Sequence, residues 1–226
     1  TELRELFANL QASCYDRELI VQDLVPGDDD GLRSITCFSD ANGDVRVWST
    51  GRVLLEDHMP TAIGNPVCIL LERNDQIAEQ AARFLKHVGY RGFSNFDVKY
   101  DPRDGVYRFF EVNTRPGRNT FYMQIGGANI VKLIVDEFVL GRPIPEQVAC
   151  EAGLYTVVPR YVVRRTVADK DARRRAMTLF DQGKAKCPTF YHADTLAHGF
   201  WARLQYLNQI RKFKRYVWDV RASNGA

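Results

Sequence analysis

The strongest constraint on the fold comes from two β-rich runs, residues 93–100 and 106–113, that one short turn joins. The turn reads Asp-Pro-Arg-Asp-Gly, and its proline and glycine supply the preset and positive φ angles that tight turns need. An antiparallel hairpin is therefore predicted here. A second hairpin is predicted over residues 31–56, where the pair Asn42-Gly43 separates two further β-rich runs. Two hairpins predict an antiparallel sheet.

Other segments have the residue spacing of helices, with an apolar stripe along one side. The clearest covers residues 73–90, with Asn74 as N-cap and Gly89 just past the end. A short buried strand is expected from Leu19 to Val25, ended by Pro26-Gly27. Further helices are expected over residues 3–14, 128–140, 169–183 and 200–218, and one or two strands over residues 154–165.

The fold class predicted from these elements is α+β: an antiparallel sheet flanked by helices, with a mainly helical C-terminal extension. Charge supports a division of the 226 residues into two regions, because residues 1–150 carry a net charge of −6 and residues 151–226 carry +9. No apolar run is long enough for a membrane span, and no signal peptide is recognisable, so a cytoplasmic location is expected. Oligomeric state is not predictable from these features.

Strand alternation places three oxygen-bearing side chains on one face of the second hairpin. In its first strand Phe96 faces one way and Asp97 the other, and in its second strand Glu111 and Asn113 share a face. Pairing across the turn sets Asp97 opposite Glu111. Two carboxylates that repel each other favour a cation between them, and Mg²⁺ takes hard oxygen ligands. The hairpin therefore predicts a magnesium site.

Two arginines, Arg115 and Arg118, follow this glutamate and asparagine closely. One alternative is that Asp97 and Glu111 are separate surface carboxylates that these arginines merely neutralise. The combined pattern of paired acids, an amide and trailing guanidinium groups favours a site for a metal ion and phosphate instead.

The segment FEVNTRPGR, with the acid of NFDVKY 14 positions before its glutamate and LIVQDLVPGDD far upstream, resembles the ATP-grasp superfamily. Its RPGRN continuation is similar to the D-aspartate ligase and carboxylate-amine ligase branch, and the resemblance runs from about Leu19 to Pro145. It implies a ligase that uses ATP and Mg²⁺ to activate a small-molecule carboxylate as an acyl phosphate. An amine then captures this intermediate as an amide.

The resemblance implies a role for each matching residue. Asp97, Glu111 and Asn113 would hold the magnesium ions that bridge the ATP phosphates. Arg115 would bind the acyl phosphate or γ-phosphate and Arg118 a substrate carboxylate, because a guanidinium fork matches both anions. No general base is assigned, and Lys99 and His58 are candidates by proximity in the pattern alone.

The cofactor-binding residues that the resemblance implies are Gln22, Asp23, Leu24, Val25, Asp29 and Arg52. The first four would meet the adenine, with the Gln22 side chain or a neighbouring carbonyl accepting from the exocyclic amine. Asp29 falls where the family places an acid on the ribose, although Asp28 and Asp30 flank it. Arg52 would reach the phosphates. For residues 22–25 the alternative is an ordinary core strand that ends in a turn. For Asp29 it is a solvated acidic loop, and for Arg52 an arginine on a strand face without a role in binding.

Members of this family also carry an N-terminal α/β domain and a lid with a glycine-rich loop, and neither is recognisable here. We therefore expect a fragment of a longer enzyme that is inactive alone. One competing interpretation is a non-catalytic nucleotide-binding or regulatory module.

The basic helix predicted over residues 200–218 suggests a further activity, because apolar residues recur at near-helical spacing between arginines and lysines. It could dock on its own domain with a solvated basic face, lie on an anionic membrane surface, or touch nucleic acid, the least expected of the three.

Overall fold

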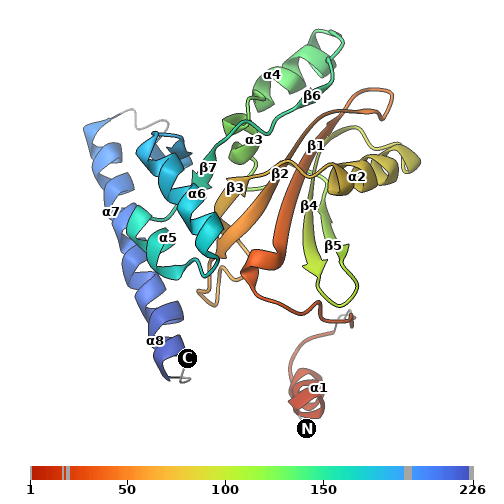
Figure 1. Ribbon diagram of the computed structural model, residues 1–226. Coiled ribbons are helices and arrows are strands. Elements are labelled where there is room, and N and C mark those ends of the chain that lie inside the picture. The colour runs from red at the N-terminus through yellow and green to blue at the C-terminus, as the bar shows by residue number, and fades with distance from the viewer. Residues whose placement is uncertain (1, 17, 19–20, 191–194, 224–226) are drawn as a thin grey trace.

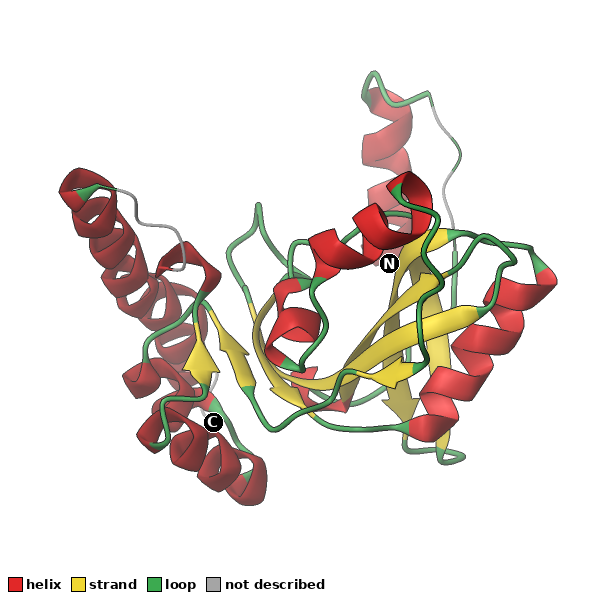
Figure 2. Ribbon diagram, turned by 90° about the horizontal axis from the view of Figure 1, so that it is seen from above, coloured by secondary structure: helices red, strands yellow, loops and turns green. Residues whose placement is uncertain are grey.

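A computed structural model of the chain describes residues 2–16, 18, 21–190 and 195–223. Its centre is a curved sheet with helices on both faces and at one end (Figures 1 and 2). The strand order is β5-β4-β1-β2-β3-β7-β8, and β6 pairs with β2. All pairings are antiparallel except β2 with β6 and β7 with β8. The strands are β1 Leu32–Ser39, β2 Val45–Glu56, β3 Pro66–Leu71, β4 Gly92–Asp101, β5 Val106–Asn113, β6 Gln147–Val148, β7 Leu154–Thr156 and β8 Ala185–Lys186.

The helices account for the rest of the regular structure, and the predicted α+β class is confirmed. The N-terminal and central helices are α1 Glu2–Ala12, the 3-10 turn η1 Asp29–Gly31, α2 Asp75–His87, α3 Phe121–Ile125, α4 Ile130–Ile134 and the π-helical η2 Val135–Val139. The C-terminal set is α5 Arg160–Thr166, α6 Lys170–Asp181, the 3-10 turn η3 Pro188–Phe190, α7 Leu196–Phe213, the π-helical η4 Lys214–Trp218 and α8 Asp219–Ser223.

Both predicted hairpins are confirmed. At the β1–β2 turn the Gly43 amide donates to the Asp40 carbonyl at 3.0 Å, and at the β4–β5 turn the Gly105 amide donates to the Asp101 carbonyl at 2.9 Å. Both glycines have positive φ, 77° and 72°, a conformation that glycine adopts without steric cost. Turn chemistry in the sequence therefore determines where β1 and β4 end and where the chain reverses into β2 and β5.

Helix α2 covers one face of the sheet. Ile77, Ala81 and Leu85 are buried there and pack with Ile35 of β1 and Phe96 of β4. The helix begins where predicted, because the Asn74 side chain accepts a hydrogen bond from the Ile77 amide at 3.1 Å. This face therefore has the helix-on-sheet packing of an ordinary core.

Two predictions for the N-terminal region are wrong. Residues 21–26 form no strand, and Leu24 is 82% exposed; residues 19 and 20 lie outside the described residues. A strand needs a partner for its backbone hydrogen bonds, and none of the described strands pairs with this segment. Helix α1 forms as predicted, but its apolar side chains are exposed and face no core.

The C-terminal region continues the same sheet, since β7 pairs with β3 and β8 pairs with β7. The predicted second strand near residue 160 is instead helix α5, which begins after Pro159. The division at residue 150 therefore stays a prediction. None of the helices within the described ranges combines the length and apolar character needed to cross a membrane.

Replacing Asn74 with alanine is expected to lower the free energy of unfolding by about 1 kcal/mol, because the first turn of α2 loses its side-chain acceptor. Chemical denaturation would measure this change. Asn74→Asp, which keeps an acceptor at the same position, should remain close to the parent, and equal losses in both variants would contradict the capping role.

Candidate active site

The face of the sheet opposite α2 carries polar side chains. On β4, Phe96 and Val98 pack toward α2, so Asn95 and Asp97 lie on the other face. The β4–β5 register pairs Asp97 with Glu111 and Asn95 with Asn113. The cross-strand pairing predicted from the sequence is therefore confirmed. The strand pair also contains one irregularity that was not predicted. The register shifts after Asp97, so that the next residue, Val98, pairs with Phe109.

Asp97 and Glu111 interact electrostatically across the two strands. Burial and, to a smaller extent, the Glu111 charge raise the pKa of Asp97 to about 6. The Asn113 side chain joins them, because its Nδ2 donates to Glu111 Oε1 at 2.9 Å. The structure thus brings the three predicted metal ligands to one place on neighbouring strands.

No group of three His, Cys, Asp or Glu side chains within the described part of the chain is arranged to hold a metal ion. A site at this position would depend on two carboxylates and the Asn113 amide oxygen. Such a hard, oxygen-only set suits Mg²⁺, which needs one or two carboxylates and completes its shell with water and phosphate oxygens. The donor chemistry therefore fits the predicted ion, and the metal role itself stays a prediction.

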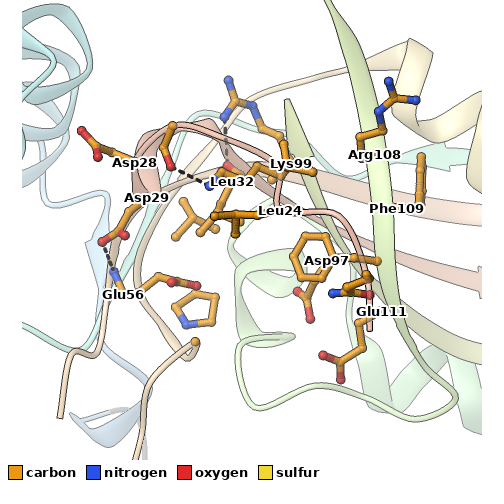
Figure 3. A pocket seen from close by; sticks show the side chains of 18 of the residues that line it. Leu24, Asp28, Asp29, Leu32, Glu56, Asp97, Lys99, Arg108, Phe109 and Glu111 are labelled. Carbon is orange, nitrogen blue, oxygen red and sulfur yellow. Dashed lines mark hydrogen bonds between the residues drawn. The ribbon is translucent and has the colours of Figure 1, made fainter. Parts of the chain in front are cut away.

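A cavity of about 760 Å³ opens beside these carboxylates (Figure 3). Its lining comes from the segment before β1, from strands β1, β2, β4 and β5, and from the end of the β2–β3 loop. Six lining residues are acidic and four are basic. The lining residues that were predicted for the site are Gln22, Asp23, Leu24, Val25, Asp29, Asp97 and Glu111, and Lys99, the candidate base, also lines the cavity. Asn113, Arg115 and Arg118 are not among the lining residues.

Two cationic side chains tether the segment before β1 to the sheet. Arg103 donates to Asp23 Oδ2 at 3.2 Å while it also binds the buried Asp101 carboxylate at 2.7 Å. Hydrogen bonds from Arg103 hold the pKa of Asp101 well below its ordinary value. Lys99 Nζ donates to the Gly27 carbonyl at 2.6 Å. These contacts keep the exposed segment against the cavity although it forms no strand.

Glu56, at the end of β2, is a cavity residue that the sequence analysis did not select. Burial and the nearby Asp29 charge raise its pKa to about 7. Asp29 Oδ2 lies 2.9 Å from His58 Nε2 and also accepts from the Glu56 amide at 3.4 Å. Many strands end in an acidic residue after an apolar run, so the sequence around Glu56 gives no sign of a site. Only its position in the structure shows that it lines the cavity.

Arg52 does not line the cavity. Its neighbour Val53 does, so strand alternation directs Arg52 to the opposite face. There its guanidinium binds Asp169, the N-cap of α6, at 2.8 Å. This geometry does not support the predicted contact with phosphates, and the strand-face alternative describes the position of Arg52 better.

The two arginines after β5 are exposed and point to different neighbours. Arg115 donates to the Pro116 carbonyl at 3.2 Å. Arg118 donates to the Asn65 side chain on the loop that ends at the cavity. In the described part of the chain neither arginine forms a salt bridge with Asp97 or Glu111. The structure therefore does not support the alternative in which these arginines neutralise the two acids.

A buried network of hydrogen bonds connects the acidic site to the arginine loop. Asn95 Oδ1 accepts from Ser34 Oγ at 3.3 Å and from Thr36 Oγ1 at 2.9 Å. Asn119 Nδ2 donates to Ser34 Oγ at 3.3 Å, and the Tyr122 hydroxyl donates to Thr36 Oγ1 at 3.0 Å. Buried polar groups that satisfy one another in this way define a rigid arrangement.

This network positions both parts of the site. Asn95 lies two residues before Asp97 on the same strand face, and Asn119 directly follows Arg118. Gly117 packs against Asn119 so closely that an added Cβ would lie 2.7 Å from the Asn119 Oδ1. The Pro-Gly-Arg-Asn loop is therefore seated on the sheet. Strand alternation could have placed Asn95 on the face of Asp97, whereas Asn119 lies outside the strands and no local signal indicates its role.

The chain has sequence relatives. Residues 60–136 match the family described as carbamoyl-phosphate synthase L chain, ATP binding domain. The chain is 34% identical over 209 residues to D-aspartate ligase of Enterococcus faecium (strain Aus0004), a match that covers 89% of this chain and 49% of that protein. It thus spans about half the length of this relative.

Two solved structures are similar to part of the chain. The biotin carboxylase domain of Hydrogenobacter thermophilus 2-oxoglutarate carboxylase, in complex with MgADP, ADP and bicarbonate, has a TM-score of 0.41 and 17% identity. That match covers 54% of this chain and 28% of the other. Rhizobium etli pyruvate carboxylase with acetyl coenzyme A has a TM-score of 0.45 and 23% identity, over 68% and 14% of the two chains.

The sheet and the paired acids thus occur in a chain that matches an ATP-binding family over part of its length. Over most of its length the chain is similar to D-aspartate ligase. The resemblance predicted from the FEVNTRPGR segment is confirmed.

Replacing Glu56 with glutamine is expected to stabilise the protein at pH 8. The folded-state pKa of about 7 lies above the ordinary value of 4.5, so the stability that the protonated group contributes is present at low pH and is lost as pH rises through about 7. After a discount for partial exposure, the gain should be about 1–2 kcal/mol at pH 8 and near zero at pH 4. Urea denaturation at both pH values measures it.

The control is Glu79→Gln on the exposed side of α2, which should change stability little at either pH. A pH-independent effect of Glu56→Gln would show that burial of this carboxylate does not oppose its ionisation.

Proposed function

We propose that this chain forms part of an ATP- and Mg²⁺-dependent carboxylate-amine ligase. In the proposed reaction a carboxylate oxygen attacks the γ-phosphorus of ATP and ADP leaves, which gives an acyl phosphate. An amine then attacks the acyl carbon, phosphate leaves, and an amide forms with loss of one proton from the amine. The observation that carries the proposal is the cross-strand pairing of Asp97 with Glu111, to which Asn113 is hydrogen-bonded, beside a cavity of nucleotide-accommodating volume.

The three paired side chains are proposed to hold magnesium, which when bound neutralises charge on the transferred phosphoryl group. A divalent cation relieves the repulsion between two such carboxylates. Gln22 to Val25 are proposed to contact the adenine, and Asp29 the ribose hydroxyls, because both line the same cavity.

Arg115 and Arg118 are proposed to bind anionic groups of the reactants. Neither pairs with the site carboxylates, and the seated loop presents both to solvent. A guanidinium fork binds phosphate or carboxylate bidentately, so Arg115 suits the transferred phosphoryl group and Arg118 the acid substrate. Asn119 holds the loop in place through Ser34.

The acid substrate is proposed to be an amino acid such as D-aspartate, on the basis of the sequence relative that is named for it. We further propose that segments beyond this chain complete the enzyme, because phosphoryl transfer depends on groups positioned around the whole triphosphate.

The first test traps the intermediate in the full-length protein. With ATP, Mg²⁺ and D-aspartate, added hydroxylamine should convert the acyl phosphate to a hydroxamate, which a ferric chloride assay detects. Glu111→Gln should reduce hydroxamate formation at least 100-fold, on the order of the effect of removing one stabilising group from a transition state. Glu79→Gln is the matched control and should retain the parent rate.

Circular dichroism and thermal unfolding would show that each variant is folded. Nucleotide binding without hydroxamate or phosphate release, across amino acids of both configurations, would favour a non-catalytic nucleotide-binding module. Loss of activity in Glu79→Gln as well would remove the link to the paired carboxylates.

The second test measures cation binding by this chain without turnover. Because the pKa of Asp97 is raised to about 6, protons and Mg²⁺ compete for the site. Millimolar Mg²⁺ should therefore raise the thermal unfolding temperature by a few degrees at pH 8 and by much less at pH 5.5.

Glu111→Gln should abolish this Mg²⁺-dependent rise, whereas Glu79→Gln should preserve it. A rise that is equal at the two pH values, or that persists in Glu111→Gln, would argue for ion binding elsewhere on the protein.

A further inference from the structure

Helix α7 exposes an unusual amount of apolar surface. Leu196 is 97% exposed, Trp201 66%, Phe200 56% and Leu207 55%. On the opposite side Ala202 is buried, and Phe213, near the end of the helix, enters the core formed with α5 and α6. The helix is thus docked by one side, and its other side lacks a cover in the described part of the chain.

The sequence spacing explains this division. The apolar residues Leu204, Leu207, Ile210 and Phe213 follow one another at intervals of three, and each interval turns the position by about −60° around a helix of 100° per residue. The stripe therefore winds from the solvent side to the buried side along α7. The first half of the stripe does not face the core, since Phe200 and the two leucines are exposed.

Basic side chains continue the exposed stripe. By the same helical geometry Arg203, Arg211 and Lys214 lie on the side of Leu196 and Leu207, a surface that we call the outer face of α7. Residues 196–218 contain five arginines and lysines and no acidic residue. The outer face therefore combines apolar and positively charged groups without internal neutralisation.

From this combination we propose that the outer face of α7 binds an anionic lipid surface. Leucine and phenylalanine side chains gain free energy when they leave water for an apolar layer. Basic residues near an anionic lipid surface are attracted to it. Nucleic acid offers the charge but no apolar layer for these side chains, so lipid matches both properties.

The position of α7 allows this contact. The helix lies beyond α5 and α6 from the central strands, well away from the cavity beside β4 and β5 (Figures 1 and 2). The helix would lie along the surface rather than cross it, as expected for an interfacial helix. Binding there would leave the candidate active site open to small molecules.

The test uses the 226-residue chain and vesicles of phosphatidylcholine, with or without about one third phosphatidylglycerol. Co-sedimentation should show binding to the anionic vesicles and little binding to the neutral ones.

The double variant Phe200→Ser and Leu207→Ser should weaken vesicle binding at least tenfold, because it removes apolar groups that carry no core contacts. Gln205→Ser, exposed on another side of the same helix, is the matched control and should bind like the parent. If the double variant unfolds, Leu196→Ser, at an almost fully exposed position, should still weaken binding measurably.

Several results would overturn the proposal. These are no binding to anionic vesicles, equal binding by the parent and the serine variants, and a preference for DNA or RNA over vesicles at the same salt concentration. Sedimentation that shows a dimer lost in the double variant, without vesicle binding, would assign the outer face to a second copy of the chain.

Discussion

The pairing of Asp97 with Glu111 is the constraint on which the candidate site depends. A one-residue slip between β4 and β5 would send Glu111 to the face that α2 covers. Apolar packing on the α2 face opposes the slip, since Phe96 packs against Phe109 with ring centroids 5.6 Å apart. The glycine turn fixes the same register at the other end of the hairpin. Apolar packing on one face thus holds two repelling carboxylates together on the other.

The cavity is assembled from distant segments by a few directional contacts. Arg103 holds Asp23, Lys99 holds the Gly27 carbonyl, and Arg118 reaches Asn65. Each of these cations is engaged with the chain segments around the cavity, and none makes an ion pair with Asp97 or Glu111 in the described residues. These cations therefore tether chain segments and do not neutralise the acidic pair.

Local signals predicted the parts of the fold that depend on near neighbours. The Asn-Gly and Pro-to-Gly turns and the Asn74 cap act within a few residues, so the two hairpins and α2 could be predicted from the sequence. Strand alternation then gave the three predicted metal ligands. Alternation along β2 also places Arg52 and Val53 on opposite faces. The sequence alone does not show which of these two faces lines the cavity, so the position of Arg52 could not be predicted.

Features that depend on distant partners were not predictable in this way. The apolar run before Pro26 has strand composition but lacks a partner strand among the described residues, and it lies at the cavity through Arg103 and Lys99. Glu56 acquires its raised pKa from burial and from Asp29, which is 27 residues away in the chain. In α7 the apolar residues are spaced three apart, so they wind around the helix and are exposed at its start and buried at its end. Strand partners and cavity walls depend on tertiary contacts between residues that are far apart in the sequence.

The two faces of the sheet therefore contribute in opposite directions to stability. The α2 face buries apolar side chains, whereas ionised Asp97 and Glu56 oppose folding at neutral pH because their surroundings favour the protonated forms. A cation bound between Asp97 and Glu111 would reverse the sign of that local interaction, so the repulsion that weakens the unliganded protein becomes part of the affinity for the ion. The hydrogen-bonded network through Asn95 and Asn119 holds the polar face of β4 and the loop after β5 together, so the two carboxylates stay close although they repel each other.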